Sequence, residues 1–340
     1  MDIKETLKKL TGAVGVSGCE DNAARTALEL LKEYAPNASV DHSSNVTALI
    51  KSSYPGAKTL MLDAHIDQIG MIVTYINDDG SLKAGACGGL DMRIMLAQSV
   101  TVHGREDVRG VIQTLPPHVS SDHTKVPDIG EITIDIGMTR EQAEKFVSPG
   151  DRITVSSRFR ELSESVVSAP AIDDRSGICA IICALDMLKS RKPKYNIAVC
   201  FSAQEETGER GVKPASFNLE PDEAIAVDVS FGRTPDSAPH ETAELGCGVM
   251  IGTSAVLDRG MTASLKKAAE NASIPYTIEV MPSSTGTNAD SIAVSRGGVK
   301  CCTLSIPIRY MHTSIEAVNV SDIDRTARLI CEYAGGDTND

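Results

Sequence analysis

Two adjacent glutamates, Glu205 and Glu206, are the first candidates for chemistry in this sequence. They follow the apolar run 197–201, which is typical of a buried strand, and they precede a turn that contains glycine. In an open α/β sheet, ligands bind at the carboxyl ends of the strands. Neighbouring residues on an extended chain point in opposite directions, so one glutamate could ligate a metal while the other moves protons. The alternative is a solvated acidic turn, and the choice depends on partners elsewhere.

Two histidines stand in comparable positions, after predicted strands. His65 follows the apolar run 59–64, and Asp67 comes two residues later. An aspartate at that spacing can orient an imidazole from behind a metal, although a lone histidine can also be structural. His312 follows the apolar segment 300–308 and is placed like the first histidine.

Aspartates complete the pattern. Asp228 ends the predicted strand 223–228, and Asp173 with its neighbour Asp174 begins an apolar helix that runs to residue 188. Two aspartates at a helix N-terminus can simply cap it. A carboxylate in that position can also bridge two cations.

Two imidazoles and three or more carboxylates form a ligand set for two divalent metals of the Zn, Co or Mn type. If one carboxylate bridges, each metal has one terminal histidine and one terminal acid, and positions remain for a water and a substrate carbonyl. This pattern predicts a two-metal hydrolase with ions about 3.5–4 Å apart. The glutamate of the pair that is not a ligand would be the general base.

The elements that must position these residues follow two different sequence patterns. Residues 1–70 and 166–340 alternate apolar strands with helices, which predicts an α/β domain. Residues 71–165 contain short strand patterns separated by Gly and Pro turns, with one helix at 139–146. We therefore expect a small all-β module inserted into the α/β domain.

Composition restricts the class of protein. The chain has 340 residues, 41% of them hydrophobic, and a net charge of −13 from 33 basic and 46 acidic residues. This charge argues against a nucleic-acid partner and suits a site that holds cations. No apolar run reaches membrane-spanning length, and the N-terminus reads as a charged amphipathic helix rather than a signal peptide. The nine cysteines contain no CxxC pair, which indicates buried free thiols in a reducing compartment, and we expect a cytoplasmic protein.

In their order and spacing, the motifs of this chain resemble those of the tetrahedral (TET) aminopeptidases, metallopeptidase family forty-two, also labelled glutamyl or deblocking aminopeptidase and "cellulase M". The resemblance covers almost the whole chain. The segments that carry it are Ser17-Gly-Cys-Glu, Ala64-His-Ile-Asp-Gln-Ile-Gly, Asp135-Ile-Gly-Met with Pro149-Gly-Asp-Arg, Ala171-Ile-Asp-Asp-Arg, Gln204-Glu-Glu-Thr-Gly-Glu-Arg-Gly, Asp228-Val and Arg309-Tyr-Met-His-Thr-Ser-Ile-Glu.

The resemblance implies a zinc-peptidase type of fold, a three-layer catalytic domain with a mixed central sheet, and an inserted β-barrel or PDZ-like dimerisation domain. It also implies assembly into a hollow tetrahedral dodecamer that encloses the active sites. The metal ligands that it implies are His65, Asp173, Glu206, Asp228 and His312.

Within that set, the resemblance implies that His65 and Asp228 are terminal ligands of one metal and that Asp173 bridges to the other. Glu206 and His312 would complete the second metal, and Glu205 would be the general base. Asp67 would be the carboxylate behind His65. The implied reaction is hydrolysis of the N-terminal residue from short peptides, with Zn, Co or Mn as the two divalent ions of each subunit.

Two positions depart from the family pattern. Gln68 stands where Glu is common, and Asn288 replaces the Asp of the usual Gly-Thr-Asp-Ala. The second change leaves open a catalytically weak shell homologue. A glycosidase of the endoglucanase type is another alternative, but polysaccharide grooves normally need aromatic platforms, and this chain has no Trp and 4% aromatic residues.

Overall fold

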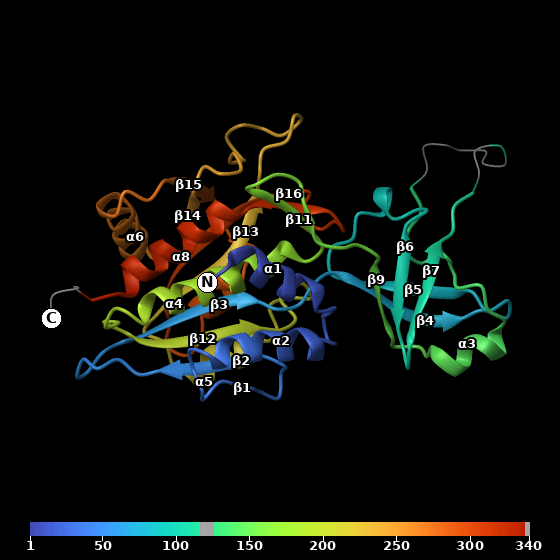
Figure 1. The fold of residues 1–340 in the computed structure, drawn as a ribbon, viewed down its shortest axis with the longest axis horizontal. Coiled ribbons are helices and arrows are strands. Elements are labelled where there is room, and N and C mark those ends of the chain that lie inside the picture. The colour runs from blue at the N-terminus through green and yellow to red at the C-terminus, as the bar shows by residue number, and fades with distance from the viewer. Residues whose placement is uncertain (116–117, 119–125, 337–340) are drawn as a thin grey trace. The chain divides into compact units, whose positions relative to one another are not determined.

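The computed structural model describes residues 1–115, 118 and 126–336, and the chain forms two compact units (Figure 1). The larger unit contains Met1–Asp67, Arg158–Met311 and Ile315–Asp340. The smaller unit contains Gln68–Ser157 and His312–Ser314. Within the described residues, no helix combines the length and the apolar character needed to cross a membrane.

A mixed sheet forms the centre of the larger unit, and eleven strands of the described chain belong to it. Strands β12, β3, β13 and β16 lie side by side and run parallel, and antiparallel neighbours flank them. The strands are β1 (Ser39–Val40), β2 (Val46–Ile50), β3 (Thr59–His65), β10 (Arg160–Glu161), β11 (Val166–Ala169), β12 (Asn196–Ser202), β13 (Glu223–Phe231), β14 (Val249–Ser254), β15 (Tyr276–Met281), β16 (Lys300–Arg309) and β17 (Glu316–Asn319).

Helices cover both faces of this sheet, because the side chains of each central strand alternate between two apolar cores. In β3, Leu60 and Leu62 lie in the larger core, which includes residues of α1, α2, α4, α6 and α8, whereas Met61 lies in the smaller core with residues of α5 and α7. The predicted three-layer α/β fold is therefore confirmed. The helices are α1 (Ile3–Gly12), α2 (Asp21–Lys32), α4 (Ile172–Leu188), α5 (Val212–Leu219), α6 (Arg259–Asn271), α7 (Ala289–Ala293) and α8 (Val320–Ala334).

The smaller unit is a closed barrel with the strand order β4-β5-β8-β7-β6-β9. Its interior is filled by apolar residues that alternate along the strands, such as Met71 and Val73 of β4. The predicted helix is present and is capped by Thr139. The elements are β4 (Gly70–Ile76), β5 (Leu82–Cys87), the 3-10 turn Met92–Ile94, β6 (Ser99–His103), β7 (Asp107–Ile112), β8 (Ile134–Asp135), α3 (Arg140–Phe146) and β9 (Arg152–Val155).

Strand register brings the polar strand ends of the larger unit together. Ser202, the last residue of β12, pairs with His65, the last residue of β3. On the other side of β3, the pairing with β13 ends at Ala226 and Asp63. Two residues further along both strands, Asp228 is level with His65. The parallel sheet therefore places His65, Asp228 and the segment after Ser202 at one edge.

The glutamate turn after β12 is held by a buried asparagine. Asn45 accepts a hydrogen bond from the Ala203 N–H (2.9 Å), and its amide group donates to the Gly211 carbonyl oxygen (2.9 Å) and to Asp41 Oδ2 (2.8 Å). A Cβ atom at Gly211 would approach Asn45 Oδ1 to 2.3 Å, so this close contact requires glycine. One side chain thus joins the two ends of the loop 203–211, which carries both glutamates.

We predict that Asn45→Ala lowers the free energy of unfolding by about 2–4 kcal/mol, because it leaves buried backbone groups at both ends of the loop without a partner. Denaturant unfolding measures this change. The control is Asn37→Ala, which removes one hydrogen bond to the Leu49 carbonyl at an exposed position and should cost less than about 1 kcal/mol. Equal losses in the two variants would show that the loop does not depend on Asn45.

Candidate metal centre

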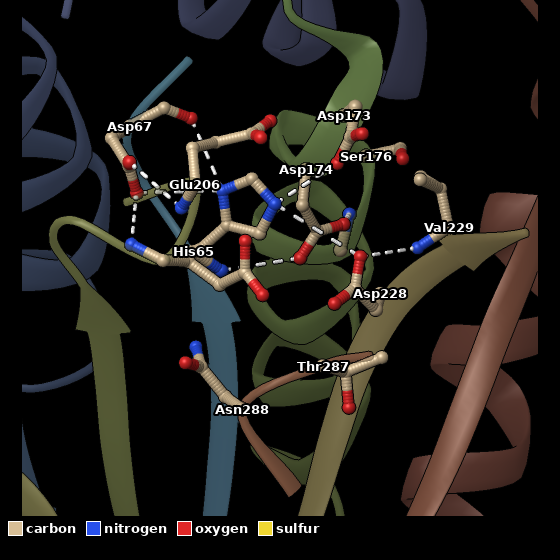
Figure 2. A network of polar contacts seen from close by, with 12 residues as sticks. His65, Asp67, Asp173, Asp174, Ser176, Glu206, Asp228, Val229, Thr287 and Asn288 are labelled. Carbon is tan, nitrogen blue, oxygen red and sulfur yellow. Dashed lines mark hydrogen bonds and ion pairs between the residues drawn. The ribbon is translucent and has the colours of Figure 1, made fainter. Parts of the chain in front are cut away.

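The His65 imidazole lies at the centre of a group of buried acidic side chains (Figure 2). Its Nδ1 is 3.1 Å from the backbone carbonyl oxygen of Asp67, which can only accept a hydrogen bond. Nδ1 therefore donates, and Nε2 is left to face Asp173 Oδ1 at 2.9 Å and Asp228 Oδ1 at 4.0 Å. This is the tautomer in which Nε2 can bind a metal.

His65, Asp173 and Asp228 form a set of possible ligands for one cation. One ligand atom from each of the three residues lies within 4.8 Å of the others, and all three side chains are buried. A carboxylate oxygen of Asp173 also lies within 4.8 Å of one of Glu206. Asp173 is therefore close both to His65 and Asp228 and to Glu206.

Asp228 is placed by the sheet rather than by a strand end. We expected the strand to stop at Asp228, but β13 continues to Phe231, because β16 pairs with it as far as Ile308. The neighbour on the other side, β3, ends at His65, so the side chain of Asp228 faces the end of that strand. Its Oδ1 also accepts a hydrogen bond from the Val229 N–H at 2.8 Å.

The protein alone does not compensate the negative charge in this cluster. Burial raises the pKa of Asp228 well above its usual value, and the neighbouring Asp174 adds to this effect. Burial lowers the pKa of His65, but hydrogen bonds with Asp173 and Asp67 outweigh it and hold the imidazole pKa well above 6.5. Buried carboxylates normally need a paired charge, and a bound cation would supply it. The donor set and its burial therefore fit a divalent metal with histidine and carboxylate ligands.

Asp67 connects the histidine to the glutamate turn. Its carboxylate accepts hydrogen bonds from the Ser17 hydroxyl, from the Glu205 N–H (2.9 Å) and from the Glu206 N–H (3.2 Å). Burial would raise the Asp67 pKa, but hydrogen bonds with His65 and Ser17 lower it below its usual value. Asp67 therefore stays ionised and fixes the backbone from which both glutamates project.

The two glutamates occupy a turn, not an extended strand end. The chain changes direction at Gln204, whose φ is +56°, and both glutamate side chains are half-buried. Burial raises the pKa of Glu205 to about 8; the charge of His65 lowers it, and that of Glu206 raises it. A carboxyl group that titrates near neutral pH can both accept and return a proton.

Two further charged residues support the centre and were not recognised as such from the sequence. Asp174 is fully buried, and its carboxylate accepts hydrogen bonds from the backbone N–H groups of His65 (3.2 Å) and Gly177 (2.9 Å). Arg175 is also fully buried; Nη1 donates to the Leu10 carbonyl oxygen at 2.6 Å, and the charge of Asp67 acts on it. Asp-Asp-Arg was visible as a motif, but nothing in the sequence pattern indicated that its last two residues face inward.

Asn288 lies beneath the acidic cluster (Figure 2). It is buried, and its amide group donates to Asp63 Oδ2 (2.8 Å) and to Ser202 Oγ (2.7 Å). An aspartate here would instead bring two carboxylates into contact. The departure from the family pattern therefore has a local reason, since the amide of Asn288 stabilises a buried Asp63. Gln68 and His312 belong to the smaller unit, and their part in the centre stays a prediction.

Comparisons with known proteins identify the family of this chain. The family model described as M42 glutamyl aminopeptidase matches residues 44–329. The chain is 34% identical to the lysyl aminopeptidase of Pyrococcus furiosus, over 96% of this chain and 94% of the relative.

Solved structures give the same picture. An aminopeptidase from the archaeon Desulfurococcus kamchatkensis superimposes with a TM-score of 0.92 at 32% identity, covering 98% of this chain and 95% of the other. The Pyrococcus horikoshii TET1 peptidase, which can assemble into a tetrahedron or a large octahedral shell, has a TM-score of 0.87 at 29% identity, with coverage of 98% and 99%. The chain belongs to the M42 family of glutamyl aminopeptidases, and it is a metallo-aminopeptidase.

Proposed function

We propose that this enzyme releases N-terminal residues from short peptides with two divalent cations and a glutamate as general base. The observation that carries the proposal is the position of Asp173. It lies 2.9 Å from His65 Nε2 and also within 4.8 Å of a Glu206 oxygen. His65 and Asp228 would hold one cation, Glu206 and His312 the other, with Asp173 shared between them.

The ligand types favour Zn, Co or Mn, since each of these ions accepts imidazole and carboxylate together. Such ions, when bound, polarise a carbonyl group and lower the pKa of a coordinated water from about 15.7 towards about 7. Asp67 would hold His65 in the required tautomer. Its hydrogen bonds to the backbone of Glu205 and Glu206 would keep both side chains in place.

Glu205 is the residue that would move protons. It is half-buried, and its backbone is anchored to Asp67. It would accept a proton from the attacking water and return it to the amine of the departing peptide, a contribution of about 10²–10⁴-fold in rate. A neighbouring cation would lower the pKa of Glu205 from its value of about 8 in the metal-free protein, and so keep it ready to accept a proton.

The substrate class follows from charge. A free α-amino group is a cation, or a metal ligand once deprotonated, and it fits a cluster of buried carboxylates. The family name refers to glutamyl substrates and one relative's name to lysyl substrates. These names leave the preferred side chain open.

Self-association through the smaller unit is part of the same proposal, and it is supported by the ability of the TET1 peptidase to assemble into a tetrahedron or a large octahedral shell. A glycosidase is disfavoured, because the acidic residues converge on a histidine with the donors of a metal site instead of standing as an isolated carboxyl pair. Release of an amino acid from an aminoacyl anilide, abolished by a chelator and restored by Zn or Co, tests the function. Chelator-resistant release of sugar would contradict it.

The pair Glu205→Gln and Glu206→Gln separates the two glutamate roles. We expect Glu205→Gln to retain both metals and to lose about 10²–10⁴-fold in kcat, because only the proton acceptor is removed. Glu206→Gln should lose one metal as well, because a ligand is removed. Metal content by atomic emission and turnover, measured on the same samples, check both. A Glu205→Gln enzyme with full metal content and unchanged kcat would disprove the assigned base.

Metal removal should make stability depend on pH. The folded pKa values of Glu205, Asp228 and His65 are all raised, so between about pH 5 and 8 the metal-free folded state binds more protons than the unfolded chain. Stability must then fall as pH rises through this window. We expect the thermal midpoint of the metal-free protein to drop by on the order of 5 °C from pH 5 to 8, and that of the loaded protein to drop less. Parallel curves with and without metal would exclude the centre as the cause.

Asn288→Asp tests whether the departure from the family pattern is adapted to this chain. The new carboxylate would lie against Asp63, whose pKa burial already raises to about 6. We expect a loss of about 1–3 kcal/mol in unfolding free energy at pH 8 and a smaller loss at pH 5, where a shared proton relieves the repulsion. Denaturant unfolding at the two pH values measures it; Asn288→Ala serves as the control, because it loses the hydrogen bonds without adding charge.

A further inference from the structure

Glu279, on the edge strand β15, is a half-buried carboxylate that the mechanism does not use. It accepts hydrogen bonds from the hydroxyl groups of Ser305 (2.6 Å) and Ser230. Both partners are neutral, and among the described residues no lysine, arginine or histidine forms an ion pair with it. Burial raises its pKa, and the two serine hydroxyls oppose that rise. A carboxylate in this setting could pair with a cation from outside the chain.

Both serines that hold Glu279 flank the metal ligand Asp228. Ser305 is paired in register with Asp228 on the neighbouring strand, so their side chains share a face about 5 Å apart. Ser230 follows Asp228 by two residues on the same face of β13. The Glu279 carboxylate is one hydrogen bond from Ser305, and Ser305 is one strand spacing from Asp228, so the two carboxylates are roughly 6–9 Å apart.

A buried hydroxyl group lies in the same region. Thr303 is fully buried, and its Oγ1 has no hydrogen-bond partner among the described residues. This oxygen lies against Gly252, where a Cβ atom would approach it to 1.9 Å. Gly252 in turn pairs with Glu279. The Thr303 hydroxyl therefore lies over Gly252, on the same face of the sheet as the Glu279 side chain.

We propose that Glu279 binds the cationic side chain of the substrate's N-terminal residue, so that the enzyme prefers lysine or arginine at that position. The inference rests on the proposed function, in which the α-amino group of the substrate binds among the buried carboxylates of the centre, which include Asp228. A lysine side chain spans roughly 6 Å from Cα to Nζ, five bonds of about 1.5 Å at tetrahedral angles, which matches the separation between the two carboxylates. An acidic N-terminal residue would meet repulsion from Glu279.

Kinetics on matched substrates test the preference. For the metal-loaded enzyme, we expect kcat/KM for lysyl p-nitroanilide to exceed that for the leucyl and glutamyl anilides. Glu279→Gln should lower the lysyl/leucyl ratio at least about tenfold, mainly through KM, with leucyl turnover retained. The control is Glu270→Gln. Glu270 is an exposed glutamate of α6 that accepts a hydrogen bond from Tyr276, a residue of β15 like Glu279. An unchanged ratio in Glu279→Gln, or a wild-type preference for leucine or glutamate, would overturn the inference.

Binding gives a readout that does not need turnover. Norleucine has nearly the shape of lysine without the ε-ammonium group. Calorimetry on the metal-loaded protein should show lysine binding at least about tenfold more tightly than norleucine in the wild type and equally in Glu279→Gln. Tight lysine binding without hydrolysis of any anilide would contradict the proposed function and support the Glu279 site. Hydrolysis of the anilides with equal binding of lysine and norleucine would support the proposed function and contradict the Glu279 site.

Discussion

The Asp67 carboxylate is the contact on which the arrangement of the centre depends. It accepts hydrogen bonds from the Ser17 hydroxyl and from two successive backbone N–H groups at Glu205 and Glu206, and its own carbonyl oxygen faces His65 Nδ1. Three segments far apart in the sequence thus meet at one residue. The same residue sets the tautomer of the histidine and the direction of the glutamate turn, so the proposed metal ligand and the proposed base are positioned together.

Charge balance is the second constraint on the site. Asp173, Asp174 and Asp228 are buried close to one another. Arg175 is a fully buried cation, and the charges of Asp67 and Asp174 act on it. Burial is the main cause that raises the pKa values of Asp174 and Asp228 well above their usual range, and neighbouring carboxylates add to the rise. Bound cations would supply the missing positive charge.

Much of the fold was predictable, because long apolar runs and amphipathic helices dominate this sequence. The central strands and the helices α1, α2, α4, α6 and α8 were expected within a few residues. Strand β14 and helix α5 were missed: β14 is short and contains Gly252, and α5 carries Pro214, which is tolerated in a first helical turn. The proposed site residues were recognisable as polar groups near the ends of apolar segments. Arg175 and Glu279 were not, because their significance lies in burial and in cross-strand register, which single-residue patterns do not carry.

The order of the ligands along the chain has a consequence for synthesis of the protein. His65 precedes the whole barrel unit, Asp173 follows it, and Asp228 comes only after two more strands of the sheet. The three side chains cannot all meet until β13 has docked beside β3, because Asp228 lies on β13. A nascent chain therefore lacks the complete set of proposed ligands until β13, and after it His312, has been synthesised.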